Sequence, residues 1–400
     1  MKRIAVIIIL FLILLCFTGI CARAADDIDY ITGNSDFEIL TAAVSDEARS
    51  LLGELGITGI GADMLFSVSF KKIFDAFFGI FTGALAKPLA AVSAVTAITL
   101  PAAAFGTLQK HKNTVELCTS GLAALTVSVG VLSLITDCAS VLGALSGFTA
   151  AFAGVFCAAV SASGGAASAA SFAAMNVFYE SFTAFICSVL SQPLGSTVCS
   201  LAFLSCLNIY SFEERLASLV KKAYILFLGF AGAVFTGVFS LNGVLSCSAD
   251  SLGLRGIKFL VSSSVPVVGG VLGESCQSVI AALSLIKNSV GVFGIITVVL
   301  TVAPVLIRLV LWIFSLSICA SLSQFTGASK TASALMIFKD ALTLLLATVL
   351  FSAAVFIFLF SRARRERPSR SLRQRKTRSP YRKDYKPLSD RRRSQDCAAP

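Results

Sequence analysis

Long apolar runs dominate this chain, and short polar segments separate them. Nine of the runs approach the roughly 20 residues that a helix needs to cross a bilayer. They lie at 88–107, 118–136, 138–160, 167–190, 193–210, 223–242, 289–307, 309–323 and 340–360. The sequence therefore predicts an all-α protein, a polytopic membrane helix bundle with about nine spans.

Residues 1–24 have the order of a secretory signal peptide. Lys2 and Arg3 precede a short apolar core, and Ala22-Arg23-Ala24 provides small residues for cleavage. We expect cleavage after Ala24. An uncleaved first membrane anchor is the alternative.

Residues 25–87 are mixed in character and contain many acidic side chains. Two parts, 47–55 and 64–77, carry apolar residues at helical spacing. We expect a small extracytoplasmic helical region here, lying on the membrane, followed by a polytopic membrane domain over 88–361.

Loop charges give an orientation for this scheme. With a translocated N-terminus, an odd number of spans places the C-terminal tail in the cytoplasm, and positive residues are expected on that side. Asp137 would then be an outside turn residue, whereas Arg308 would lie in a cytoplasmic loop. The other basic residues on the predicted cytoplasmic side are Lys110, Lys112, Arg215, Lys221 and Lys222, while Lys330 and Lys339 fall on the opposite side.

One stretch, 256–294, is apolar enough for membrane depth yet unusually rich in polar residues, glycine and proline. Irregular backbone survives at such depth only where protein or a wet cavity meets it. We expect a re-entrant element within 256–288, or alternatively an extracytoplasmic loop that leads into an ordinary helix. The candidate functional residues of the stretch are Lys258, Pro266, Gly269, Gly270, Gly273, Glu274, Lys287, Asn288, Gly291 and Gly294.

A carboxylate also interrupts the predicted span at 167–190. Glu180 follows Asn176 by four residues, so the two should share one helical face. An intramembrane carboxylate indicates function because a charge there is expensive. The alternative is that Glu180 lies at the membrane interface.

Composition supports the membrane class, since 56% of residues are hydrophobic and 14% are charged. The net charge of +11 resides in residues 362–400, where 12 Arg and 3 Lys face four acidic residues. We expect this segment to be a disordered basic cytoplasmic tail that binds anionic lipid. Nucleic acid is not an expected partner.

The residue types that usually carry catalysis are scarce. The chain has a single histidine, His111, and contains neither a CxxC pair nor a GxxxxGK[ST] phosphate loop. We therefore expect no enzyme activity, no catalytic residues, no bound metal and no cofactor.

Three blocks carry a resemblance to a known family: Lys258-Phe259, Val265 to Gly270 (VPVVGG) and Lys287 to Gly294 (KNSVGVFG), followed by Pro304. Together with the signal sequence and the many spans, they resemble the stage III sporulation protein AE family. The resemblance covers nearly the whole chain to about Ser361. The long basic tail departs from the family pattern.

The resemblance implies a multi-pass protein of endospore-forming bacteria, made in the mother cell and placed in the outer forespore membrane. It further implies a role in a channel-like complex that joins mother cell and forespore. The implied partners are the other stage III sporulation A proteins and a forespore membrane partner. The alternative function is a stand-alone secondary transporter or permease with a broken-helix substrate site.

Overall fold

The computed structural model describes residues 42–56, 70–105, 112–162, 165–189, 195–207, 212–264 and 269–365. Within these ranges the secondary structure is helical, as expected from the apolar runs. The predicted signal peptide lies outside the described residues, as does the predicted tail from residue 366 on. Residues 362–365, predicted to begin the disordered tail, are instead helical and end α11. Five of the described helices contain a segment long and apolar enough to cross a membrane: Phe74–Ala102, Thr114–Ala162, Ser218–Asn242, Val290–Phe325 and Ser329–Phe358. The chain is a polytopic helical membrane protein.

Helix α3 (Asp46–Leu55) nearly coincides with the first helical segment predicted in the acidic region. Ser45 caps its beginning by accepting a hydrogen bond from the Ala48 amide, and Gly56 ends it in the left-handed conformation at φ 78°. Its apolar face is buried in the main core, with Ala48 and Leu52 among the residues covered there. A ten-residue helix is marginal in water, so this docking stabilises α3.

Helices α5 (Phe70–Phe105) and α6 (Lys112–Ala162) continue through positions where we had placed boundaries. Pro88, the predicted start of the membrane domain, lies inside α5. Asp137, the predicted turn residue, lies inside α6, so the predicted spans 118–136 and 138–160 belong to one helix. The lone charge between two apolar runs had suggested a turn, but the helix continues, and Asp137 pairs with Arg308 within the bundle.

Helix α7 (Ala166–Val189) covers the predicted span at 167–190 but is not among the five segments that qualify as membrane spans. Helix α8 (Gly195–Leu207) replaces the span predicted at 193–210. With 13 residues, α8 is only about 20 Å long and too short to cross a bilayer.

The C-terminal half consists of α9 (Phe212–Ser264), α10 (Gly269–Phe325) and α11 (Ser329–Arg365). Arg308 lies inside α10, so the predicted spans 289–307 and 309–323 are also one helix. Gly327, at φ 79°, reverses the chain after α10, and the Ala328 amide donates to the Ser323 carbonyl at 2.9 Å.

The stretch predicted to be re-entrant is helical on both sides of 265–268, which lie outside the described residues. α9 continues to Ser264 and α10 begins at Gly269. Re-entry into the membrane stays a prediction.

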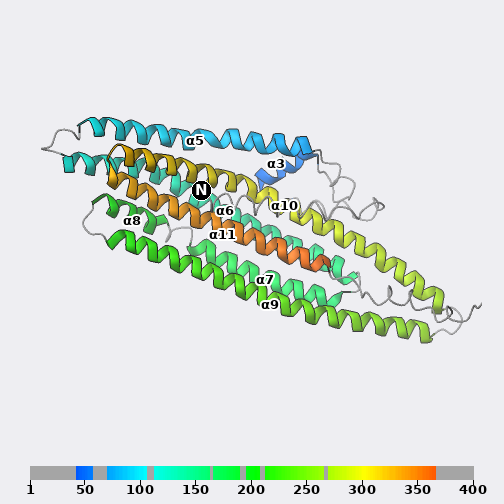
Figure 1. Ribbon diagram of the computed structural model, residues 1–400. Helices are drawn as coiled ribbons and strands as arrows, with labels where there is room; N and C mark the ends of the chain where they lie inside the picture. The colour runs from blue at the N-terminus through cyan, green and yellow to red at the C-terminus, as the bar shows by residue number, and fades with distance from the viewer. Residues whose placement is uncertain are drawn as a thin grey trace, which may run out of the picture. The chain divides into compact units, whose positions relative to one another are not determined.

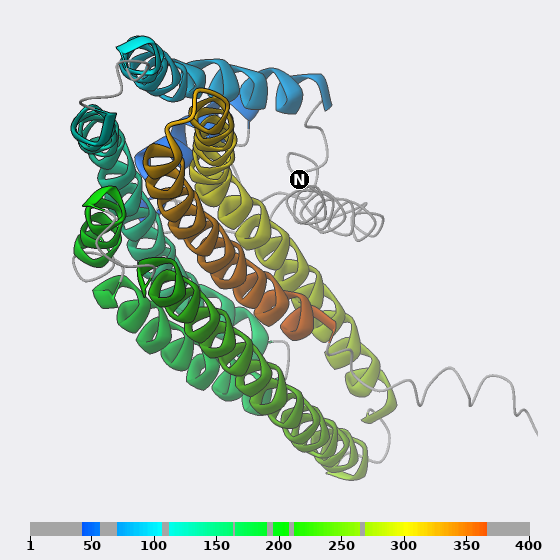
Figure 2. The same cartoon turned by 60° about the vertical axis from the view of Figure 1, so that its left-hand side comes forward.

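Side-chain contacts fix the relative directions of the long helices. Phe178 and Phe185 of α7 contact Phe235 and Phe227 of α9, so these helices are antiparallel. Cys157 of α6 donates to the Ala169 carbonyl of α7, and Cys187 of α7 donates to the Ala139 carbonyl of α6, so α6 and α7 are also antiparallel. Figure 1 shows α5, α6, α7, α9, α10 and α11 running in alternating directions, and Figure 2 shows α10 and α11 side by side. The beginning of α5 and the end of α11 therefore lie at the same end of the bundle.

The nine predicted apolar runs are stacked in two tiers rather than laid side by side. One tier contains 138–160, 167–190, 223–242, 289–307 and 340–360, and the other contains 88–107, 118–136, 193–210 and 309–323. α6 and α10 pass through both tiers. With 51 and 57 residues, they are about 77 and 86 Å long, well beyond the roughly 40 to 45 Å of a complete bilayer.

The first turns of two helices are capped by a carboxylate from a neighbouring helix. Asp250 of α9 accepts hydrogen bonds from the amides of Ala167 and Ser168 at 2.8 and 3.0 Å, at the first turn of α7. Glu116 of α6 accepts more distant bonds, 3.3 and 3.4 Å, from Ser329 and Lys330 at the start of α11. Asp250 satisfies two amides that the helix itself leaves open, whereas Glu116 accepts from one amide and from the Ser329 hydroxyl. Both carboxylates complement the helix dipole.

We expect Asp250→Asn to lower the free energy of unfolding by about 1 kcal/mol, because it removes the charge from these hydrogen bonds. Glu116→Gln is the matched variant and should cost less, since its bonds are longer. Thermal unfolding of the detergent-solubilised full chain measures both. Equal losses would contradict the role given to Asp250.

Candidate functional site

A single arginine interrupts the apolar segment Val290–Phe325 of α10. Arg308 lies one helical turn after Pro304 and one turn before Trp312. A charge inside such a segment is costly unless it has partners, so its surroundings indicate function.

Arg308 binds two carboxylates that come from different parts of the chain. Its Nη2 lies 2.7 Å from Glu47 Oε1 of α3, and its Nη1 lies 3.7 Å from Asp137 Oδ2 of α6. The Arg308 side chain is 33% exposed, and the two carboxylates are 53% and 39% exposed. One guanidinium thus joins α3, α6 and α10.

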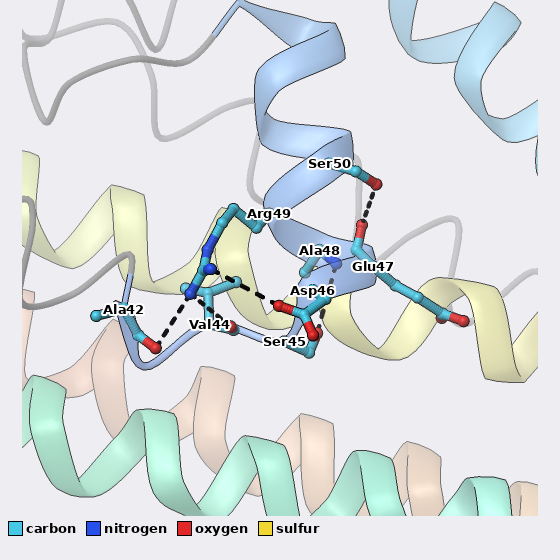
Figure 3. A network of polar contacts seen from close by, with 8 residues as sticks. All are labelled: Ala42, Val44, Ser45, Asp46, Glu47, Ala48, Arg49 and Ser50. Carbon is cyan, nitrogen blue, oxygen red and sulfur yellow. Dashed lines mark hydrogen bonds and ion pairs between the residues drawn. The ribbon is translucent and has the colours of Figure 1, made fainter.

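The other polar groups of α3 leave Glu47 available for this contact. Figure 3 shows Arg49 folded back along its own helix, where it donates to the carbonyls of Ala42 and Val44 and pairs with Asp46 at 3.6 Å. The Glu47 carboxylate extends away from this network (Figure 3). The first turn of α3 therefore presents one acidic side chain to α10.

An open cleft of about 1080 Å³ lies around these groups. α3, α5, α6 and α10 contribute its walls, with Gly79 and Gly83 of α5 facing the bundle across it. Its charged lining residues are Glu47, Glu54, Asp75, Asp137, Lys87 and Arg308, four carboxylates against two cations. The cleft therefore has a mixed lining in which six charged groups, net acidic, stand among apolar residues.

Trp312, the only tryptophan of the chain, closes part of the cleft wall. Its indole ring lies directly on Gly130 of α6, and a Cβ added at 130 would overlap the ring. Glycine is required there by this close approach. The contact holds α6 and α10 together one turn from Arg308.

Pro304 lies in the cleft wall on the other side of Arg308. Proline has no amide hydrogen and cannot donate to the Leu300 carbonyl, so the ladder of α10 is weakened there. The arginine is therefore carried by a part of α10 that bends more easily than a regular helix.

The second polar site lies on α7. Asn176 Nδ2 donates to Glu180 Oε1, which confirms that the two share one face. Asn176 is buried, and its Oδ1 has no hydrogen-bond partner among the described residues. Glu180 is half-buried.

The remaining predicted residues are only partly placed. Gly291 and Gly294 lie on a buried face of α10, where a Cβ at 291 would be 3.7 Å from the Phe156 ring. Lys258 falls in α9, and Gly269, Gly270, Gly273, Glu274, Lys287 and Asn288 fall in α10, but their side chains are outside the description. Pro266 lies outside the described residues. A functional grouping of these side chains stays a prediction.

Comparisons with known proteins place the chain among sporulation proteins. The family model for stage III sporulation protein AE matches residues 62–361. Stage III sporulation protein AE of Bacillus subtilis (strain 168) is 26% identical over 201 residues, which are 50% of this chain and 50% of that protein. The chain thus matches about half the length of this curated relative. No solved structure matches.

Gly130→Ala should lower the free energy of unfolding by about 1 to 3 kcal/mol, because the added methyl group forces Trp312 from its place. Gly143→Ala in the same helix is the control, since nothing lies within 4 Å of its added Cβ. Thermal unfolding gives the stability, and emission from the single tryptophan reports the displacement. An unchanged emission spectrum in Gly130→Ala would contradict the contact.

Arg308→Gln should loosen α3 from the bundle, because Glu47 then loses its cation. In double-mutant cycles we expect a coupling of about 0.2 to 1 kcal/mol between Arg308 and Glu47, in the range of partly exposed ion pairs. The coupling with Asp137 should be smaller, since that pair is 3.7 Å apart. Hydrogen exchange of the α3 amides provides an independent measure, and faster exchange is expected in Arg308→Gln alone.

Proposed function

Because the chain belongs to the stage III sporulation protein AE family, we propose that it is a membrane subunit of a channel-like complex joining mother cell and forespore during endospore formation. The family match carries this proposal. The matched residues include every described helix from α5 to α11 except the last four residues of α11. The matched part is therefore the membrane bundle itself.

The proposed partners are the other stage III sporulation A proteins and a forespore membrane partner, and the proposed location is the outer forespore membrane. The lengths of α9 and α10 support contacts beyond the bilayer. Their apolar segments are Ser218–Asn242 and Val290–Phe325, so each helix continues for more than 20 residues past its apolar segment, toward 265–268. These extensions are about 30 Å long and provide a place for partners to bind.

The finer membrane arrangement is also part of the proposal. We place α3 in an extracytoplasmic helical region and residues 362–400 in a cytoplasmic basic tail that binds anionic lipid. α5 begins and α11 ends at the same end of the bundle. The proposed orientation places these two ends on opposite sides of the membrane, so it requires that an odd number of the six alternating helices cross the bilayer completely. Cysteine labelling at Lys71 and Ser361 from each side of the membrane tests it.

The Arg308 cleft is the proposed working part of the subunit. Six charged groups line it among apolar residues, and α10 is weakened beside it by Pro304. A polar path would need the charged groups of the cleft, and a movable joint would need the weakened part of α10. The role is non-enzymatic.

We expect Arg308→Gln to reduce heat-resistant spore formation at least tenfold in the chain's own endospore-forming host. Lys222→Gln, an exposed charge change on α9, should leave spore formation within twofold of the parent. Membrane levels of both variants are measured by immunoblot. Normal spore counts for Arg308→Gln would remove the cleft from the proposal.

Purified full chain in liposomes distinguishes a complex subunit from a stand-alone transporter. A subunit should give no flux of small solutes until its partner proteins are added. Flux through the purified chain alone would instead support the transporter.

A further inference from the structure

Glu180 lies well inside the apolar part of the bundle. The rings of Phe178 and Phe182 both contact the ring of Phe235 on α9, at 4.7 and 5.2 Å, so Glu180 is level with Phe235. Tyr179 is hydrogen-bonded to Ser352 of α11 at 2.8 Å, which gives the same level on that helix. We therefore adopt the first of our two sequence interpretations, that the carboxylate lies within the apolar layer.

The nearest charged positions on the neighbouring helices are far above or below it. On α9, Lys222 and Asp250 are 13 and 15 residues from Phe235, about 20 Å away along the axis. On α11, Asp340 and Arg362 are 12 and 10 residues from Ser352, about 15 to 18 Å away. No charged residue in the described parts of α9 and α11 is therefore level with Glu180, and Asp137 of α6 lies near the level of Cys187, toward the end of α7.

Its described neighbours satisfy the carboxylate only in part. Asn176 donates one hydrogen bond from its own helix. A carboxylate accepts several hydrogen bonds, and its charge at membrane depth calls for a cation or further donors. The half-exposed position of Glu180 leaves its remaining surface open toward the outside of the bundle.

The face of α7 beside Glu180 suits another helix. Its exposed residues are mostly small and recur every three or four positions: Ala170, Ala173, Ala174, Val177, Ser181, Ala184 and Ser188. Small residues let two membrane helices approach closely. A cation on the approaching helix would complement Glu180.

A second copy of this chain does not provide that cation. Copies related by rotation about the membrane normal keep every residue at its own height. Arg308 is already bound to Glu47 and Asp137, and Lys221 is bound to Asp340 at 2.8 Å. These pairs lie at the far end of the layer, more than about 10 Å from the level of Glu180.

We propose that the Glu180 face of α7, from Ala170 to Ser188, binds a transmembrane helix of a different protein that carries a lysine or arginine at mid-membrane. The ion pair formed there gives the contact its specificity, and the small residues give it close packing. This contact does not depend on the function proposed for the Arg308 cleft.

Glu180→Gln tests the charge without removing the hydrogen bond to Asn176. The full chain is produced in its own host during sporulation, and its complex is resolved by native gel electrophoresis in mild detergent. We expect Glu180→Gln to reduce the high-mass form at least tenfold and Glu180→Asp to retain most of it. An undiminished complex in Glu180→Gln would overturn the proposal, because an uncharged carboxamide would then suffice.

Steric substitution tests the face. Ala184→Leu should disrupt the complex, whereas Ala233→Leu, on an exposed face of α9 near the level of Glu180, should not. The thermal unfolding temperature of each purified variant should match the parent, which separates lost binding from misfolding. Equal effects of the two leucines would overturn the assignment of the face to α7.

A photo-crosslinking amino acid at Ser181 identifies the occupant. The expected crosslinked peptide comes from another protein's apolar helix and contains a lysine or arginine. Changing that residue to glutamate should abolish the complex, and combining the change with Glu180→Lys should restore it. Crosslinks to lipid, to a second copy or to a helix without a basic residue would each overturn the proposal, as would a failed charge exchange.

Discussion

The fold depends on the pairing of Arg308, the single charge in the apolar segment Val290–Phe325, with carboxylates of α3 and α6. α6 and α10 can continue past Asp137 and Arg308 because these residues neutralise each other across the bundle, with Glu47 of α3 as the nearer carboxylate. An unpaired arginine at this depth would favour a break that brings it to water. The same principle explains why Lys221 and Asp340 occur together where α9 and α11 meet. Few charges are present, and their pairing decides where helices may be uninterrupted.

The sequence was most informative about where apolar helices occur. Its periodicity placed α3 to within one residue at the N-terminal end, and the shared face of Asn176 and Glu180 followed from helical spacing alone. The sequence wrongly predicted helix boundaries at Asp137 and Arg308, because hydropathy treats a lone charge as a boundary whether or not a distant residue neutralises it. The pairing of residues 171 positions apart leaves no local signal. The sequence hinted at the pair in that Asp137 and Arg308 each interrupt an otherwise unbroken apolar run.

Stacking of the apolar runs changes how the stretch at 256–294 is understood. Long helices flank residues 265–268, which lie outside the described part of the chain. Polar residues accumulate where α9 and α10 have passed their apolar segments, which accounts for the mixed composition without requiring re-entry. Gly291 and Gly294, at the end of the stretch, already belong to the packed core.

The carboxylate caps of α7 and α11 also constrain the order in which the protein can be completed. The first turn of α7 is satisfied by Asp250, which the ribosome adds more than 80 residues later. Glu116 similarly precedes the helix it caps by more than 200 residues. During synthesis, α7 must therefore wait with open amides until α9 arrives, and α6 holds an unused carboxylate until the last helix is made. Final assembly of the bundle therefore follows the synthesis of α11.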